Sequence, residues 1–166
     1  TRGRGERQWH LSRRGQGSSA SGTAAGTAGL CWQAVSHFFA YLARMKFIQR
    51  WGLMRNTQVE NIQEHSLQVA MIAHALAVLK NTRFGAEIDP ERTALLAVFH
   101  DAEEVITGDL PTPIKYFNPQ VAQAIDSVEA VAKDRLLRML PDDLRGAYEE
   151  LFFAVEADDE AWACVK

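Results

Sequence analysis

The strongest local feature of the sequence is Thr93-Ala-Leu-Leu-Ala-Val-Phe-His100-Asp101. Here a mostly apolar run leads into a histidine and an aspartate. Asp89 is a good N-cap residue, and Pro90 fits the first position of a helix that follows it. Gly108 is a natural helix terminator. The sequence therefore predicts a helix from Asp89 to about Thr107, with the His-Asp pair inside it.

The pair His100-Asp101 suggests a metal site, because an ionised aspartate among apolar neighbours is costly unless its charge is compensated. A divalent metal provides that charge and accepts both imidazole nitrogen and carboxylate oxygen as ligands. His65 lies near the start of the preceding predicted helix and could reach the pair if the two helices pack side by side. A lone His-Asp pair more often forms a cap or a salt bridge, so the pair by itself leaves these interpretations open.

Glu104 lies four residues after His100, one turn along the same face of the predicted helix. A carboxylate there could take a proton from a metal-bound water, whose pKa the metal lowers. These groups together make metal-assisted hydrolysis of a phosphate ester plausible. Glu103 is expected to point away into solvent, and His74 is expected to be a core or partly exposed histidine without a chemical role.

Apolar residues at helical spacing predict further helices on both sides of this stretch. They are expected over Trp32 to Arg50, Asn61 to about Leu79, Asn118 to about Leu140, Asp142 to about Val155, and from near Glu160 with Asp158-Asp159 as the cap. The second of these is expected to supply the core side chains Leu67, Val69, Met71, Ile72, Leu76 and Leu79. Loops are predicted at 81–88 and at 109–113. No segment alternates with a period of two, so the sequence predicts an all-α domain.

The composition is that of an ordinary globular protein and gives no sign of nucleic-acid or membrane binding. The net charge is −3, of which residues 1–30 carry +4 and the remainder −7. Residues 1–30 are rich in Gly, Ser, Ala and Arg, which predicts a disordered leader before a domain at 31–166. No apolar run reaches the roughly 20 residues that cross a bilayer. Cys31 and Cys164 lack metal-site spacing and are expected to be reduced thiols in a cytosolic protein.

From about residue 36 to 166 the chain resembles the bacterial 5′-deoxynucleotidases of the HD-domain superfamily. The resemblance rests on several motifs that occur in order and at suitable intervals, which together are far more specific than a His-Asp pair. They are Arg50-Trp51, Leu53-Met-Arg-Asn56, Glu60-Asn61, Glu64-His-Ser-Leu-Gln-Val-Ala70, His100-Asp101, Glu104, Thr107-Gly-Asp-Leu-Pro-Thr-Pro113 and Lys115-Tyr-Phe-Asn118.

The resemblance implies an HD-domain bundle of about five to six helices that is usually a homodimer. The dimer is expected if the family's C-terminal helices, which would follow residue 166, are present. It implies removal of phosphate from deoxyribonucleoside 5′-monophosphates with a divalent transition metal, such as cobalt or manganese. By matching position, the metal ligands are His65, His100 and Asp101, of which His65 and Asp101 also face the substrate. Glu104 and Asp101 are catalytic in the same scheme, with Glu104 assisting the attacking water.

The same resemblance assigns substrate contacts to three further residues. Arg50 holds and orients the phosphate as a catalytic residue, a role that suits a bidentate guanidinium. Trp51 packs against the sugar and helps to reject a 2′-hydroxyl, and Asp109 accepts a hydrogen bond from the 3′-hydroxyl. From the residues alone, Arg50 could equally be a helix-end cation, Trp51 a core anchor and Asp109 a turn residue.

Two departures from the family keep other functions open. The family completes its metal site with an aspartate in a V-K-x-A-D pattern, and this chain ends at Val165-Lys166, so the domain is expected to be incomplete there. Asp158 and Asp159 do not occupy the right place in that pattern, and 152–157 does not match convincingly. The alternatives are an HD phosphohydrolase acting on a triphosphate, cyclic dinucleotide or alarmone, and a catalytically impaired fragment that binds metal or nucleotide.

Overall fold

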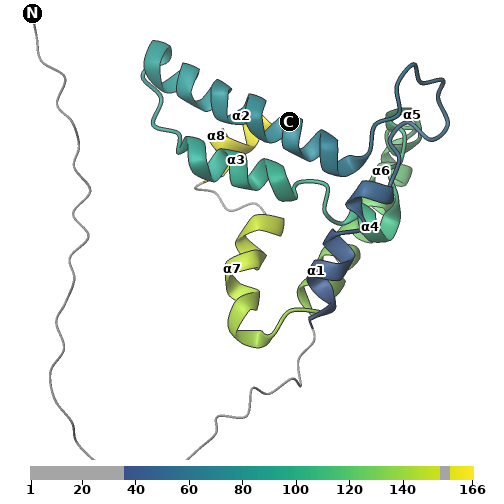
Figure 1. Ribbon diagram of the computed structural model, residues 1–166. Coiled ribbons are helices and arrows are strands. Elements are labelled where there is room, and N and C mark those ends of the chain that lie inside the picture. Colours follow the sequence, from purple (N-terminus) through teal and green to yellow (C-terminus); the bar gives the residue numbers. More distant parts are fainter. Residues whose placement is uncertain (1–35, 154–157) are drawn as a thin grey trace, which may run out of the picture. The chain divides into compact units, whose positions relative to one another are not determined.

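The computed structural model of the chain describes residues 36–153 and 158–166, and within these ranges the fold is all-α (Figure 1). The predicted leader and Cys31 lie outside the described residues. The helices, with the 3-10 helix η1, are α1 (His37–Leu42), η1 (Met45–Phe47), α2 (Ile62–Phe84), α3 (Pro90–Phe99), α4 (Glu104–Thr107), α5 (Thr112–Lys115), α6 (Pro119–Leu137), α7 (Asp142–Phe152) and α8 (Asp159–Val165). No helix among the described residues is both long and apolar enough to span a membrane.

Helices α2 and α3 lie side by side and form the centre of the packing, with α8 against both of them (Figure 1). The buried face of α2 is a stripe of mostly small residues, Ile62, Ser66, Ala70, Ala73 and Ala77. On the facing helix, Thr93, Leu96 and Ala97 are buried. Small side chains let two helix backbones approach closely, so this stripe brings the first turn of α2 near the end of α3.

The helix starts that the sequence predicts from capping residues are confirmed. Asn61 Oδ1 accepts hydrogen bonds from the backbone N–H groups of the first turn of α2. Asp89 caps α3 in the same way, and Asn118 caps α6. These side chains satisfy backbone donors that have no partner inside a helix.

Several predicted helix lengths are wrong. The first described helix spans only His37–Leu42, because tighter i→i+3 hydrogen bonds and η1 replace it before Arg50. Gln49 then pairs with Asn61 in an isolated antiparallel bridge, which requires extended backbone. α2 continues past Leu79 to Phe84, where Gly85 ends it with a left-handed φ of 70°.

The later boundaries also differ from the prediction in detail. α6 ends at Leu137, and α7 ends at Phe152. The loop predicted at 109–113 gives way to the one-turn helix α5 at Thr112. Asp158 stands at the N-cap of α8 without a side-chain capping bond, because its carboxylate accepts from Arg92 at 2.7 Å instead.

The core predicted for α2 is also mostly wrong. Leu67, Met71, Ile72, Leu76 and Leu79 are exposed, and Val69 is partly buried. Apolar side chains occur all round this helix, so periodicity did not identify the buried side. The neighbours α3 and α8 cover the small-residue stripe and leave the larger side chains outside.

Candidate metal centre

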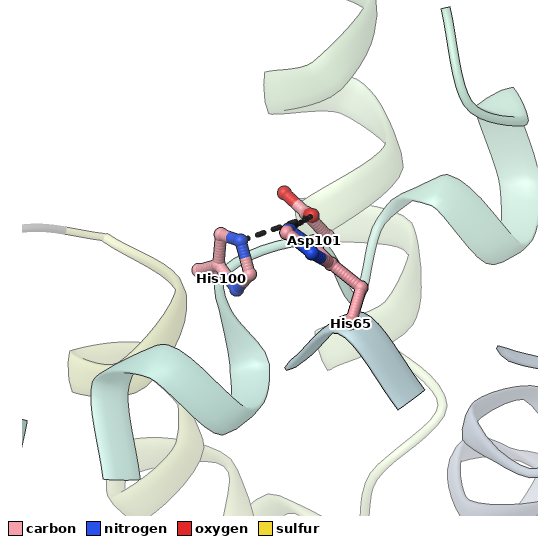
Figure 2. A group of neighbouring side chains, drawn as sticks. All are labelled: His65, His100 and Asp101. Carbon is pink, nitrogen blue, oxygen red and sulfur yellow. Dashed lines mark ion pairs between the residues drawn. The ribbon is translucent and has the colours of Figure 1, made fainter. Parts of the chain in front are cut away.

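His65, His100 and Asp101 come together in space, as the sequence predicts (Figure 2). One ligand atom from each lies within 4.8 Å of the ligand atoms of the other two. Asp101 Oδ2 is 3.0 Å from His100 Nε2 and 3.5 Å from His65 Nε2. Two imidazole nitrogens and one carboxylate oxygen that converge in this way form a donor set suited to a divalent transition metal.

The chain turns at His100-Asp101, where the sequence analysis wrongly predicts a continuous helix. α3 ends at Phe99, and short-range bonds such as Ala102 N–H to Phe99 O and Glu104 N–H to Asp101 O carry the backbone into α4. His100 Nδ1 bonds to the carbonyl of Ala97 at 2.7 Å. A continuing helix would use that carbonyl as a backbone acceptor, so this side-chain contact favours ending the helix.

The ring nitrogens of the two histidines have different partners. Because His100 uses Nδ1 for the carbonyl of Ala97, its Nε2 is left for Asp101 or a metal. His65 lies in the first turn of α2, and Arg50 Nη1 contacts its Nδ1. An arginine can only donate, so Nδ1 of His65 is the acceptor in this contact.

The charges of these groups shift one another's pKa. Burial alone would lower the pKa of His100, but the hydrogen bond and charge of Asp101 outweigh it and raise that pKa. Burial would raise the pKa of Asp101, and the bond and charge of His100 lower it below its usual value. The pKa of His65 is lowered, first by burial and then by the charge of Arg50. Asp101 is therefore ionised and available as an anionic ligand.

Glu104 begins α4 and does not continue the face of a helix that carries His100, so that part of the prediction is wrong. It nevertheless lies close to the site, because its backbone N–H donates to the carbonyl of Asp101 at 3.1 Å. Burial, followed by the charges of Asp101 and Asp109, raises the pKa of Glu104 to about 9. Its Oε2 is buried and has no hydrogen-bond partner within residues 36–153 and 158–166. A carboxyl group in this state gains strongly from a nearby cation.

Arg50, Trp51 and Asp109 form a corner beside the metal-ligand cluster. Asp109 Oδ2 accepts a hydrogen bond of 2.8 Å from the backbone N–H of Trp51, which has a left-handed φ of 62°. Arg50 Nη1 pairs with Glu60 at 2.9 Å, and its guanidinium lies over the Trp51 ring. A left-handed φ strains the backbone of a bulky residue. The hydrogen bond to Asp109 therefore helps to hold Trp51 in this conformation.

Glu103 is the one residue near the site for which the sequence analysis gives the wrong environment. It is only 5% exposed rather than solvated, and its Oε1 lies 3.3 Å from Lys133 Nζ on α6. The partner Lys133 is thirty residues away and has no local pattern that would reveal it.

A sequence profile of the YfbR-like 5′-deoxynucleotidases matches residues 37–166. The chain belongs to this family. It is 60% identical over 131 residues to a 5′-deoxynucleotidase of Vibrio cholerae, and the match covers 79% of this chain and 68% of that protein. It is 55% identical over 131 residues to a 5′-deoxynucleotidase of Erwinia tasmaniensis, covering 79% of this chain and 66% of the relative. The chain thus spans about two thirds of the length of these relatives.

The fold has a counterpart among solved structures. A crystal structure of an HD-domain phosphohydrolase from Listeria innocua superposes with a TM-score of 0.67 at 23% sequence identity. The match covers 78% of this chain and 61% of that protein. The predicted HD-domain helical fold is therefore confirmed.

Proposed function

We propose that the chain carries the catalytic centre of a metal-dependent 5′-deoxynucleotidase, which removes phosphate from deoxyribonucleoside 5′-monophosphates. The observation that carries this proposal is the convergence of His65, His100 and Asp101 within 4.8 Å beside Arg50 and Glu104. Membership of a family whose curated relatives are named 5′-deoxynucleotidase supports the choice of substrate.

The proposed metal is a divalent transition ion such as cobalt or manganese, held by His65, His100 and Asp101. The donor set fits it, because the His100 ring directs Nε2 towards the cluster and Asp101 is ionised. A metal bound there would supply positive charge that polarises a phosphoryl oxygen and makes a water more acidic. Two imidazoles and a carboxylate suit several first-row ions, and metal availability selects among them.

Arg50 and Glu104 are the proposed catalytic partners. Arg50 Nη1 contacts Nδ1 of His65, so the guanidinium lies beside the cluster. A guanidinium can bind two oxygens of a phosphate group at once. The pKa of Glu104, raised to about 9 as described, falls beside a divalent cation. An ionised Glu104 carboxylate would be placed to accept a proton from the attacking water, and Asp101, which is ionised, would hold the metal.

Trp51 and Asp109 are proposed to bind the sugar. Trp51 is exposed and lines a hollow together with Glu60, Glu64 and Gln68. Asp109 is partly exposed and accepts a hydrogen bond from the backbone N–H of Trp51 beside it. The Trp51 ring packs against the deoxyribose and disfavours a 2′-hydroxyl by shape. Asp109 has a second carboxylate oxygen that can accept from the 3′-hydroxyl while Oδ2 keeps the Trp51 N–H.

The test is phosphate release from matched deoxy and ribo 5′-monophosphates, with added cobalt or manganese and with a chelator. The variants His100→Ala and Asp101→Ala are expected to lose release by at least a hundredfold, because each removes a proposed metal ligand. His74→Ala is the matched control, since His74 is an exposed histidine on α2 and should behave like the wild type. Release that survives both ligand variants, or that ignores the chelator, contradicts the proposal.

A substrate panel separates this reaction from related ones. Faster turnover of a nucleoside triphosphate, a cyclic dinucleotide or an alarmone would assign the chain to another HD phosphohydrolase activity. Metal-dependent binding of a deoxynucleotide without release would assign it a binding role.

The proposed assembly is a homodimer in the cytoplasm. The resemblance suggests the dimer, and the exposed apolar side chains of α2 offer a surface for it. The buried free thiol of Cys164 is consistent with a reducing compartment.

A further inference from the structure

Glu103 lies inside the turn that carries the candidate metal ligands, and the proposed reaction gives it no task. The turn runs from His100 to Glu103, and the backbone carbonyl of Glu103 accepts hydrogen bonds from the N–H groups of Ile106 and Thr107 in α4. The side chain is buried, although it is a carboxylate. Isolated buried carboxylates are rare because the loss of hydration is costly, so a compensating group must act on it.

Lys133 on α6 is that compensating group. Its Nζ lies 3.3 Å from Glu103 Oε1, and α4 and α6 pack against each other. The side chain of Lys133 is 22% exposed, which keeps the ion pair largely away from water. The second oxygen, Glu103 Oε2, is buried and has no hydrogen-bond partner among the described residues. The ion pair with Lys133 is therefore the main interaction that holds the Glu103 carboxylate in place.

The ion pair is connected to the metal ligands through the backbone. Glu103 is two residues from Asp101 in a turn of short-range hydrogen bonds, so we expect a shift of its side chain to move the backbone that carries the ligand.

We propose that the Glu103–Lys133 ion pair is a positioning device that fastens the metal-ligand turn to α6 and sets the geometry of His100 and Asp101. Glu103 acts through its neighbours in the turn and does not bind the metal. The pair also leaves no net buried charge next to the cluster. This inference rests on the metal centre of the proposed function. It predicts that residues beyond the ligands tune metal affinity, as outer groups commonly do.

The test measures cobalt binding to the full chain by equilibrium dialysis and records the visible absorption of bound Co²⁺, which reports the ligand geometry. The variants are Lys133→Met, which keeps the apolar stem, Glu103→Gln, which keeps the shape, and the double variant. Each single change is expected to weaken cobalt binding about tenfold and to shift the absorption band. Because both changes disrupt one unit, the double variant is expected to be no weaker than the weaker single variant.

Arg138→Met is the matched control. Arg138 pairs with Asp134 on the exposed surface of the same helix, so its loss removes an ion pair without touching the turn. Unchanged cobalt affinity and absorption in the folded Lys133→Met and Glu103→Gln variants would overturn the inference, even if their melting temperatures fall. Multiplicative losses in the double variant would overturn it as well. Failure of the wild type to bind cobalt would overturn the metal centre itself, and this outcome is distinct from the other two.

Discussion

At the scale of single residues, Glu104 shows how neighbours set the chemistry of a side chain. Asp101 and Asp109 place two negative charges around a carboxyl group that is already buried. The ionised form of Glu104 is therefore disfavoured until a cation arrives. The acid that the sequence suggests as a proton acceptor is thus prepared by its surroundings to respond to metal binding.

The first prediction concerns the pH dependence of the metal-free fold. The pKa of Glu104 is raised from 4.5 to about 9, so its contribution to stability is complete below pH 4.5 and declines as pH rises towards 9. Glu104→Gln removes that decline and should raise the free energy of unfolding at pH 8 by roughly 4–5 kcal/mol, because pH 8 lies 3.5 units above the ordinary pKa of 4.5 and each unit is worth about 1.4 kcal/mol. The two proteins should differ little at pH 5. Denaturant unfolding in chelator at both pH values checks this, and parallel pH curves would contradict it.

The second prediction separates two tasks of Asp109. If its bond to the Trp51 N–H matters, Asp109→Ala should lower kcat/KM about tenfold even for a 2′,3′-dideoxynucleoside monophosphate, which has no 3′-hydroxyl. Asp109→Asn keeps an acceptor for that N–H and should retain more activity on this substrate. If the wild type and Asp109→Ala turn over the dideoxy substrate equally, the bond to the Trp51 N–H does not affect catalysis. The contact with the sugar is then the one remaining task of Asp109.

At the scale of elements, the α2–α3 pair depends on small side chains. Ala70, Ala73 and Ala77 line the buried face of α2, and no large side chain keeps α3 at a distance there. Close approach of the two helices brings His65, in the first turn of α2, to His100 and Asp101 at the end of α3. The packing therefore assembles the candidate metal centre.

The third prediction tests this close approach. Ala73 is fully buried, so Ala73→Leu forces the helices apart and should cost about 1–3 kcal/mol of unfolding free energy. Cobalt affinity should fall with it, because His65 moves away from the other two ligands. Ala75→Leu is the control, since Ala75 is exposed on the same helix and the change should have little effect. Equal effects of both substitutions, measured by thermal unfolding and dialysis, would contradict the role of the stripe.

At the scale of the whole molecule, the outer face of α2 exposes a group of large apolar side chains. Leu67, Met71, Ile72 and Leu76 are exposed together with Leu79 further along the helix. Monomeric proteins rarely expose large contiguous apolar patches, and such patches mark interaction surfaces. The homodimer proposed above would cover such a face with a second copy of the chain.

The fourth prediction follows from that assembly. Met71 is 59% exposed, so Met71→Glu should shift the protein from dimer to monomer without a large loss of stability. Sedimentation velocity measures the shift. Val131→Glu on α6 is the control, because Val131 is also exposed but lies on another helix. A wild-type chain that sediments as a monomer at all concentrations would contradict the dimer.

Local sequence rules predict the helical class and the starts of the main helices, because Asn61, Asp89 and Asn118 cap helices through bonds to residues just after them. The three candidate metal ligands follow from the motifs that the chain shares with its family. Tertiary structure alone decided which side of α2 is buried, since apolar residues surround that helix and only the contacts of α3 and α8 select a face. It also decided the pairing of Glu103 with Lys133, two groups that only folding brings together. Burial changes the energy of a charged side chain far more than sequence neighbours do.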